Sequence, residues 1–259
     1  MRDKRWGDDC VPASYDELGK GYAVQRRADA RIASVIWSAL GDVLSVVNVG
    51  AGTGSYEPTD RIVLAVEPSD MMISQRPEGA APCMRGSAEA LPLESGAYDA
   101  AMALLTIHHW SDWRAGLREM RRVARRRIVL LTFDAEASDF WLTRDYFPAL
   151  NELDRRTMPP LSELANELGE FHVTPVPVPH DCTDGFLGAY WRRPHIYLDS
   201  LARSSMSPFA RVDAEDGLKR LASDLDSGVW HKRNADLLDL ESLDVGYRLV
   251  RWDINTRPS

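Results

Sequence analysis

One short segment, a buried strand that runs directly into closely spaced glycines, limits most strongly what this chain can fold into. The largely apolar run Val46–Val49 is followed by glycine at alternate positions, namely Gly50, Gly52 and Gly54. Glycine allows the backbone to turn sharply and to approach a ligand closely. In the dinucleotide fingerprint G-x-G-x-x-G, the last glycine would fall at Ser55 of this chain. The segment therefore predicts a ligand-binding loop at the carboxyl end of a strand, with a spacing that does not favour NAD.

Strands and helices alternate along the first half of the chain. Apolar residues at helical spacing within residues 15–40 predict one or two helices ahead of the core. The strand-like runs that follow are Ser45–Val49, Ile62–Val66, Tyr98–Leu104 and Arg127–Phe133, and the clearest helix is Asp112–Ala124. This alternation predicts an α/β fold with a parallel, doubly wound sheet.

The second half of the chain has fewer strands and more helix. We expect helices from Asp134 to about Gly169, a strand at Val173–Val178 and a last strand at Gly246–Asp253. The long return between these strands, about residues 180–245, predicts a helical insert before the last strand. Its amphipathic run at Gly217–Val229 is typical of a helix that packs across a sheet.

Charge and cysteine content exclude several classes of protein. The net charge is −8 at pH 7, which opposes binding to nucleic acid or to an anionic membrane. The three cysteines are odd in number and far apart, which argues against a disulfide framework and for a cytoplasmic protein. No apolar run approaches the roughly 20 residues that a membrane span needs. The basic run Arg121–Arg127 is expected to complement a helix end, and binding of an acidic partner is the alternative.

Further elements fit a nucleoside ligand. The second strand ends in Glu67, whose carboxylate can accept hydrogen bonds from both ribose hydroxyls. Met72 stands where a soft side chain can lie against an adenine face, and Gly86–Pro92 can supply polar groups to the adenine edge. Taken singly, these residues also fit a solvated strand end, a core methionine and a plain turn. Taken together with the glycine spacing, they favour S-adenosylmethionine (SAM) over NAD.

Several motifs, in this order, resemble those of the class I SAM-dependent methyltransferases, specifically the methyltransferase type 11 group. The motifs are VGAGTG, VEPSDMM, GSAEALPL, YDAAMALLTIHHW and LREMRRVARRRIVLLTF. The resemblance is closest over residues 15–133. It implies a doubly wound, Rossmann-like, seven-stranded sheet in the order 3-2-1-4-5-7-6, preceded by N-terminal lid helices. It also implies a single domain, 1–259, in which residues 1–44 form the lid, 45–133 bind SAM and 134–259 form the acceptor side.

The resemblance assigns cofactor roles to individual residues. The glycine loop would lie beside the methionine part of SAM, Glu67 would bind the ribose, and Ser87 with Ala88 would contact the adenine. The set expected around SAM, or around its product S-adenosylhomocysteine (SAH), is Tyr22, Arg27, Gly50, Ala51, Gly52, Gly54, Glu67, Pro68, Met72, Ser87, Ala88, Glu89 and Leu105. No metal is expected, because the run His180–Cys182 has no partner pair at ligand spacing.

Three features depart from the family pattern. Asn48 stands where an acid usually precedes the glycine loop, and Ser87 stands where an aspartate usually contacts the adenine. The interval from Gly50 to Glu67 is short and contains Pro58, so the helix after the loop is expected to lack about one turn. These departures predict a SAM pocket with fewer charged contacts than usual.

The segment Tyr15–Tyr22, followed by Arg26 and Arg27, resembles the lid of the same group. A tyrosine and an arginine of that lid reach the SAM carboxylate, and the arginine fork suits this task. Tyr22 and Arg27 are the expected pair, with Arg26 as the alternative to Arg27. An ordinary charged helix face is the other interpretation of the segment.

His108 and His109 are the candidate catalytic residues, because they follow the fourth strand, where the methionine and acceptor sites of this family meet. A histidine has a pKa suited to proton transfer near neutral pH. The alternative is that the pair only shapes the start of the helix after Ser111 and Asp112. Residues expected to contact the acceptor are Tyr15, Trp110, His180, Tyr190 and Trp191.

The sequence therefore favours a SAM-dependent methyltransferase that acts on an oxygen, nitrogen or carbon atom of a small-molecule acceptor, and secondary metabolism is a setting that fits it. A protein that kept the SAM site but lost catalysis is the alternative. An NAD-dependent oxidoreductase agrees less well with the glycine spacing. Neither nucleic acid nor membrane is an expected partner, and the chain is expected to be a monomer or a homodimer.

Overall fold

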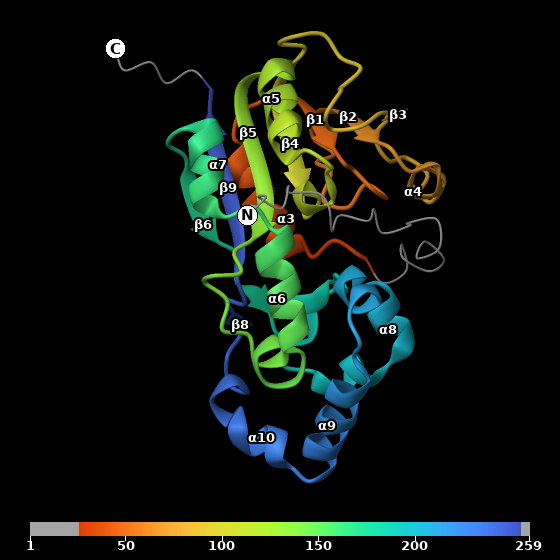
Figure 1. Ribbon diagram of the computed structural model, residues 1–259. Coiled ribbons are helices and arrows are strands. Elements are labelled where there is room, and N and C mark those ends of the chain that lie inside the picture. The colour runs from red at the N-terminus through yellow and green to blue at the C-terminus, as the bar shows by residue number, and fades with distance from the viewer. Residues whose placement is uncertain (1–25, 255–259) are drawn as a thin grey trace, which may run out of the picture.

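The computed structural model describes residues 26–254, and Figure 1 shows a sheet flanked by helices, with further helices beyond one end of it. The strands are β1 (Ser45–Val49), β2 (Ile62–Glu67), β3 (Cys83–Arg85), β4 (Tyr98–Leu104), β5 (Ala124–Phe133), β6 (His172–Pro175), β7 (Val178–Pro179), β8 (Ser242–Leu243) and β9 (Tyr247–Asp253). The α-helices are α3 (Ala30–Leu40), α4 (Asp70–Ser74), α5 (Trp113–Val123), α6 (Pro148–Thr157), α7 (Leu161–Leu168), α8 (Ser200–Ser204), α9 (Glu215–Asp226) and α10 (Val229–Arg233).

The main sheet has seven strands in the order β3-β2-β1-β4-β5-β9-β6. β9 is antiparallel to both of its neighbours, and the other pairs are parallel. Because β9 is the seventh strand of this sheet along the chain, the order is the predicted 3-2-1-4-5-7-6. The doubly wound, Rossmann-like α/β fold is therefore confirmed. β7 and β8 form a separate two-stranded sheet.

Side chains of the central strands alternate between two hydrophobic clusters, one on each face of the sheet. In β1, Val46 belongs to the cluster that contains Ile36 of α3, whereas Val47 belongs to the cluster that contains Leu117 and Met120 of α5. Successive residues of a strand point to opposite faces, so helices on both faces require apolar residues at every position. This explains why the central strands appear in the sequence as nearly continuous apolar runs.

Two strand predictions are corrected. β3 has only three residues, none of them fully buried, and therefore carries no apolar pattern that could have predicted its position. The expected strand Val173–Val178 is divided between β6, which ends at Pro175, and β7, which begins at Val178. Proline has no N–H to donate to a strand ladder, so prolines in this segment interrupt the pairing.

The helix expected after the glycine loop is absent: residues 50–61 form turns and irregular backbone. The prediction of a helix shortened by about one turn was therefore wrong. Gly52, Gly54 and Tyr56 have φ values of +53°, +90° and +66°, which a right-handed helix does not contain. Pro58 follows them and removes a further N–H donor.

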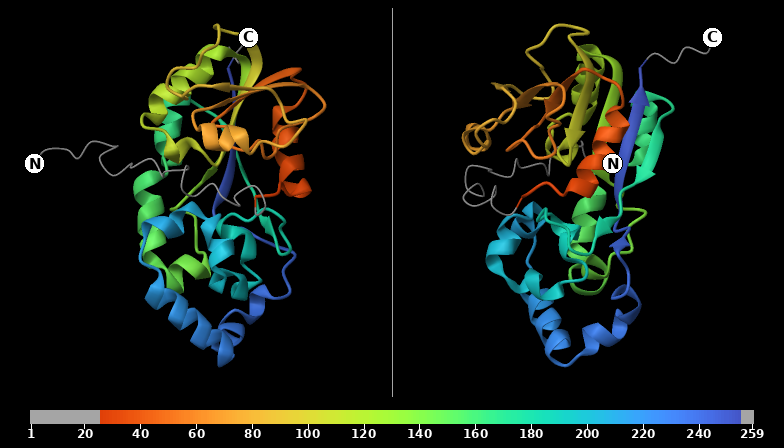
Figure 2. Two further views of the ribbon diagram at one scale, coloured as in Figure 1. Left: turned by 90° about the vertical axis from the view of Figure 1, so that its right-hand side faces the viewer. Right: turned by 180° about the vertical axis from the view of Figure 1, so that it is seen from behind.

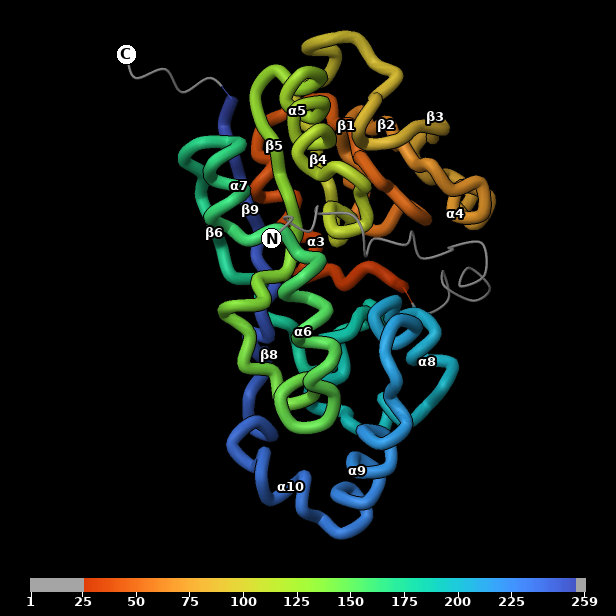
Figure 3. The backbone as a smooth tube through the Cα atoms, in the orientation of Figure 1, coloured from red at the N-terminus to blue at the C-terminus, as the bar shows by residue number. Residues whose placement is uncertain are grey.

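The carboxyl ends of the parallel strands point toward the second group of helices, as the views in Figure 2 show. The tube in Figure 3 follows the chain from β7 through α8, α9 and α10 before it returns in β9. This excursion is the predicted helical insert, and α9 is its amphipathic helix. The main contacts of α9 are with α10 and with the short helix Pro194–Leu198 of the same insert, so the expectation that it packs across the sheet is corrected. Among residues 26–254, no helix is both long and apolar enough to cross a membrane.

Candidate active site

The glycine loop lies at the carboxyl ends of β1 and β2. The amides of Gly50 and Ala51 both donate to the carbonyl oxygen of Val66, at 2.8 and 3.1 Å. Gly50 has a φ of +67°, and a Cβ on it would lie 2.3 Å from Oγ1 of Thr106, so a larger residue does not fit. A Cβ on Gly52 would instead meet no atom within 4 Å. The loop therefore packs tightly against Thr106 at Gly50, whereas there is free space beside Gly52.

A buried polar network holds the loop in the region where a helix was expected. Nδ2 of Asn48 donates to Oε1 of Glu57 at 3.0 Å, and Nη2 of Arg76 donates to both oxygens of Glu57 at 2.9 and 2.8 Å. Nη1 of Arg76 also donates to the carbonyl oxygen of Gly52 at 3.2 Å. The Glu57 and Arg76 side chains are only 7% and 6% exposed. The network thus connects the residue before the loop, the loop itself and the segment after α4.

Gly54 belongs to this network and does not line the cavity described below. A Cβ on Gly54 would lie 3.0 Å from Nη1 of Arg76 and 3.1 Å from Oε2 of Glu57. The predicted cofactor contact of Gly54 is therefore replaced by a structural role, because this glycine leaves room for the ion pair.

Glu67 ends β2 and is buried, with both of its carboxylate oxygens facing backbone amides. Oε2 accepts a hydrogen bond from the amide of Gly52 at 2.8 Å, and Oε1 accepts one from the amide of Ser69 at 3.0 Å. Burial raises the pKa of Glu67, while these two backbone hydrogen bonds act in the opposite direction. Each oxygen has a second lone pair, so the carboxylate can still accept hydrogen bonds from a ligand.

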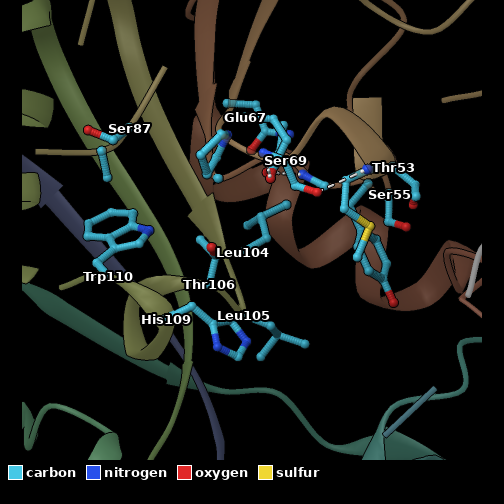
Figure 4. A pocket seen from close by; sticks show the side chains of 18 of the residues that line it. Thr53, Ser55, Glu67, Ser69, Ser87, Leu104, Leu105, Thr106, His109 and Trp110 are labelled. Atoms are coloured by element: carbon cyan, nitrogen blue, oxygen red, sulfur yellow. Dashed lines mark hydrogen bonds between the residues drawn. The ribbon is translucent and has the colours of Figure 1, made fainter. Parts of the chain in front are cut away.

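These elements surround a cavity of about 350 Å³, which we call the large cavity. The predicted residues that line it are Gly50, Ala51, Gly52, Glu67, Pro68, Met72, Ser87, Ala88, Glu89, Leu105, His109 and Trp110. Figure 4 shows Ser87 and Trp110 on one side, and Glu67 with Thr53 and Ser55 on the other. Arg26, the alternative to Arg27, also lines it, and the lining residues that sequence reasoning did not select as ligand contacts are Asn48, Thr53, Ser55, Tyr56, Ser69, Leu104, Thr106 and Ser111. Several of these directly adjoin predicted residues, so longer motifs would have included them.

Arg26, and not Arg27, lines the large cavity. Nε of Arg26 donates to Oδ1 of Asp184 at 2.6 Å, and Asp184 also accepts a hydrogen bond from the hydroxyl of Tyr56 at 2.8 Å. Arg27 is exposed and lies outside the cavity wall. The choice of Arg27 is thus corrected, because pairing with a buried aspartate directs Arg26 inward. Tyr15 and Tyr22, the other expected lid residues, lie outside the described residues.

The loop Gly86–Pro92 is tied to the start of α5 by Glu89. Oε1 of Glu89 accepts hydrogen bonds from the amide and hydroxyl of Ser111, at 2.8 and 2.9 Å, and from the amide of Asp112 at 3.3 Å. Burial acts to raise the pKa of Glu89, but these hydrogen bonds lower it overall. The loop is therefore anchored by Glu89, while Ser87 and Ala88 present their groups to the cavity.

His108 and His109 form a short helical turn after β4, with ring centroids 3.8 Å apart. His109 lines the large cavity, and both histidines line a second cavity of about 70 Å³. Burial lowers the pKa of His108 to about 4 and also lowers that of His109, so both imidazoles are neutral at physiological pH. The start of α5 is capped by Asp112, whose carboxylate accepts from the amide of Ala115 at 2.9 Å. Capping therefore does not account for the two histidines.

Three residues expected at the acceptor site lie outside both cavities. Trp191 is fully buried in the hydrophobic core, and its Nε1 donates to the carbonyl oxygen of Val178 at 2.8 Å. Tyr190 is buried in the same core. His180 has its Nε2 3.5 Å from a carboxylate oxygen of Glu241. These predictions are corrected, because packing and surface contacts occupy the side chains.

Two further features concern metal ligands and thiols in the part of the chain that the structure describes. Within residues 26–254, no group of three or more His, Cys, Asp or Glu side chains could hold a metal ion. Cys83 and Cys182 are both free thiols.

Comparison with known proteins agrees with this geometry. The profile of a family described as "Methyltransferase domain" matches residues 47–131. A solved structure from Anabaena variabilis, described as a methyltransferase from an antibiotic biosynthesis pathway, is 35% identical, with a TM-score of 0.82 over 88% of this chain and 98% of that chain. No curated protein matches the sequence.

Two other solved structures share the fold at lower identity. A SAM-dependent methyltransferase of Thermotoga maritima is 17% identical, with a TM-score of 0.56 over 95% of this chain and 98% of that chain. The plantazolicin methyltransferase, in complex with a desmethyl analogue and SAH, is 13% identical, with a TM-score of 0.53 over 94% of each chain.

Proposed function

The chain belongs to the SAM-dependent methyltransferases, and from this premise we propose that it methylates an oxygen, nitrogen or carbon atom of a small-molecule acceptor. The observation that carries the proposal is the meeting of two cavities. The large cavity, beside the glycine loop, and the smaller second cavity share Arg26, Leu105 and His109 as wall residues. Methyl transfer requires donor and acceptor to be held against each other, and adjoining cavities suit that requirement.

The residues of the large cavity fit SAM. A Cβ on Gly52 would meet only open space, so a ligand can approach the backbone closely at this point. Glu67 would accept hydrogen bonds from the ribose, and the buried Met72 would lie against the adenine. Arg26 is the cation on this wall and would meet the SAM carboxylate, a role in which Tyr22 would join it.

When bound, SAM supplies an electrophilic methyl group. The chain's own residues then have to orient the acceptor and exclude water from the junction of the cavities. His109 stands at this junction and, because burial lowers its pKa, is neutral at physiological pH. A neutral imidazole can accept a hydrogen bond or a proton from the acceptor. His108 faces the second cavity and would contact the acceptor there.

The proposed acceptor class is supported by the neighbours. The Anabaena protein is described as belonging to an antibiotic biosynthesis pathway, and the plantazolicin methyltransferase was crystallised with an analogue of its substrate type. We therefore propose a small-molecule acceptor of secondary metabolism. We also propose that the chain works as one domain, with residues 134–259 on the acceptor side.

Titration calorimetry of the full chain with SAM, SAH and NAD tests the cofactor assignment. We expect SAM and SAH to bind and NAD not to compete with them. Competition by NAD with no binding of SAM would contradict the proposal. Turnover of methyl-labelled SAM with a panel of small alcohols, amines and activated carbon acids tests catalysis. SAM binding without turnover of any acceptor would favour the alternative of a scaffold protein that has lost activity.

A further inference from the structure

The second cavity lies between the sheet and the helical insert. Its wall combines residues from the ends of β4, β5 and β9 with residues of α6 and of the loop after α8. Most of the wall is apolar, and its largest side chains are Phe133, Phe186 and Tyr247. Its volume of about 70 Å³ suits a compact group of a ligand whose other parts extend into the large cavity.

Asp154 is the acidic side chain on this wall. It lies on α6 one turn before Met158, which lines the same cavity, and only 4% of it is exposed. Within residues 26–254, no hydrogen bond or ion pair reaches its carboxylate. Burial raises the pKa of Asp154 to about 7, and the charge of Arg211 acts in the opposite direction. A buried carboxyl group without such partners lowers the stability of the fold. This cost indicates that the group serves to bind a ligand and not to stabilise the folded chain.

Three other polar side chains on this wall already have partners within the folded chain. Oγ of Ser205 donates to two backbone carbonyl oxygens, at 3.1 and 2.7 Å. The hydroxyl oxygen of Tyr247 accepts a backbone N–H at 3.4 Å. Arg26 is paired with a buried aspartate at 2.6 Å. Asp154 differs from these three side chains in lacking a hydrogen-bond donor, which a ligand would supply.

We propose that the second cavity binds the acceptor and that Asp154 holds a protonated amine of that acceptor. The inference rests on the proposed function, which identifies the adjoining large cavity as the methyl-donor site. An ammonium group brings both N–H donors and the positive charge that a buried carboxylate requires. The apolar wall accommodates a hydrocarbon or aromatic body next to the amine. An alcohol would supply a donor without the charge, and an acidic acceptor would be repelled.

Pairs of primary amines and alcohols on the same carbon skeleton, from propyl to hexyl and benzyl, test the inference. Their binding to the SAH-saturated full chain is measured by NMR titration for the parent protein, Asp154→Asn and Glu152→Gln. Glu152 is an exposed acid on the same helix, so its variant is a matched change in charge. We expect an amine to bind the parent about tenfold or more tightly than its alcohol. The preference should disappear in Asp154→Asn and remain in Glu152→Gln.

The absence of any amine preference in the parent, or its persistence in Asp154→Asn, overturns the inference. Thermal unfolding of ligand-free Asp154→Asn and Asp154→Leu provides a second test. We expect the leucine variant to be at least as stable as the parent, because it removes a buried carboxyl group that lacks a partner. A marked loss of stability in both variants would assign Asp154 a structural role and overturn the inference.

SAH titrations separate this inference from the proposed function. We expect the parent and Asp154→Asn to bind SAH with equal affinity, because Asp154 does not line the large cavity. Failure of the parent to bind SAH would contradict the proposed function. The amine panel would then be repeated without SAH, and its outcome would still decide the role of Asp154.

Discussion

Glu67 shows how a single carboxylate can serve both the glycine loop and a ligand. Its carboxylate accepts hydrogen bonds from the amides of Gly52 and Ser69, so it holds together the glycine loop and the segment that follows β2. Glu67 also lines the large cavity, and each of its oxygens keeps a lone pair that can accept a further hydrogen bond. A strand-end acid is common on protein surfaces, and burial distinguishes this one.

Replacing Glu67 with alanine should weaken SAH binding by about 2–3 kcal/mol, because charge-assisted hydrogen bonds to the ligand are lost and the loop amides lose their acceptor. Glu67→Gln should have a smaller effect, since the amide oxygen can still accept. Isothermal titration calorimetry measures both affinities. Glu78→Gln, at an exposed acid, is the control that should match the parent. Unchanged affinity in Glu67→Ala would show that this carboxylate does not hold the ligand.

The raised pKa of Asp154 predicts a specific dependence of stability on pH. The pKa is about 7 in the folded protein and near 3.8 ordinarily, so the folded state binds this proton more tightly than the unfolded state. The stabilisation is complete below about pH 4 and is lost as the pH rises toward about 7. Charged and titratable groups around the second cavity are Arg26, His108, His109, Tyr247 and Arg211. Both histidines are neutral between pH 5 and pH 8, because burial lowers their pKa values.

Urea unfolding of the parent and of Asp154→Asn between pH 5 and pH 8 measures this contribution. The free energy of unfolding of the parent, relative to the variant, should fall by up to about 1.4 kcal/mol per pH unit as the pH rises toward 7. Glu152→Gln should leave the pH profile of the parent unchanged. A constant difference between the parent and Asp154→Asn would show that this carboxyl does not titrate in that range.

At the scale of elements, the ion pair between Glu57 and Arg76 holds the segment after β1 in place, where a helix was expected. Residues 50–61 are irregular, and Arg76 holds them through Glu57 and the carbonyl oxygen of Gly52. The pair is almost fully buried, so each charge depends on the other. The loop geometry therefore depends on a residue that lies beyond the next strand in the sequence.

Arg76→Met should lower the free energy of unfolding by about 3–5 kcal/mol, because it leaves the charge of Glu57 buried without its partner. The double variant Glu57→Gln with Arg76→Met should recover part of this loss. Urea unfolding gives the stabilities. The exposed pair of Arg85 and Asp70 is the control, and Arg85→Met should cost no more than about 1 kcal/mol. An equal loss of unfolding free energy in Arg76→Met and Arg85→Met would mean that the buried ion pair does not stabilise the loop.

At the scale of the whole molecule, buried aromatic side chains fasten the insert to the segment after β5. Trp141 packs edge to face against Trp230 and Tyr197, with ring centroids 5.2 and 5.9 Å apart. Its Nε1 donates to the carbonyl oxygen of Trp191 at 2.9 Å. The large cavity draws no wall residue from this cluster, so the packing of the insert is separate from the wall of that cavity.

Trp141→Leu should lower the free energy of unfolding by about 3–5 kcal/mol, since it opens a space in the aromatic cluster. The folded variant should still bind SAH with the affinity of the parent. Urea unfolding and calorimetry measure the two quantities. Leu201→Ala, at an exposed site of the insert, should change stability by less than about 0.5 kcal/mol. A weaker SAH affinity in folded Trp141→Leu would show that the two halves are energetically coupled.

The sequence by itself determined the fold class and the position of the glycine loop, because their signals are local. Strand periodicity, helix capping at Asp112 and the spacing of Gly50 and Gly52 are encoded in neighbouring residues. These signals predicted the alternating α/β fold and the ligand loop, whereas the order of the sheet and most of the predicted residues that line the large cavity came from the resemblance of the motifs to the methyltransferase family. Glu67 was correctly placed at the end of β2 for the same reason.

Only the tertiary structure decided which side chains face the cavities. Asp184 pairs with Arg26 and directs it toward the large cavity, and Arg76 donates a hydrogen bond to the glycine loop. Trp191 lies in the core and donates a hydrogen bond to Val178. Each of these contacts joins residues that are far apart in the sequence. Asp154 carries no sequence signal at all, because an acid on an amphipathic helix is ordinarily exposed. A sequence pattern predicts which residues share one face of a helix or strand. The direction in which each side chain points depends on the residues that pack against that face.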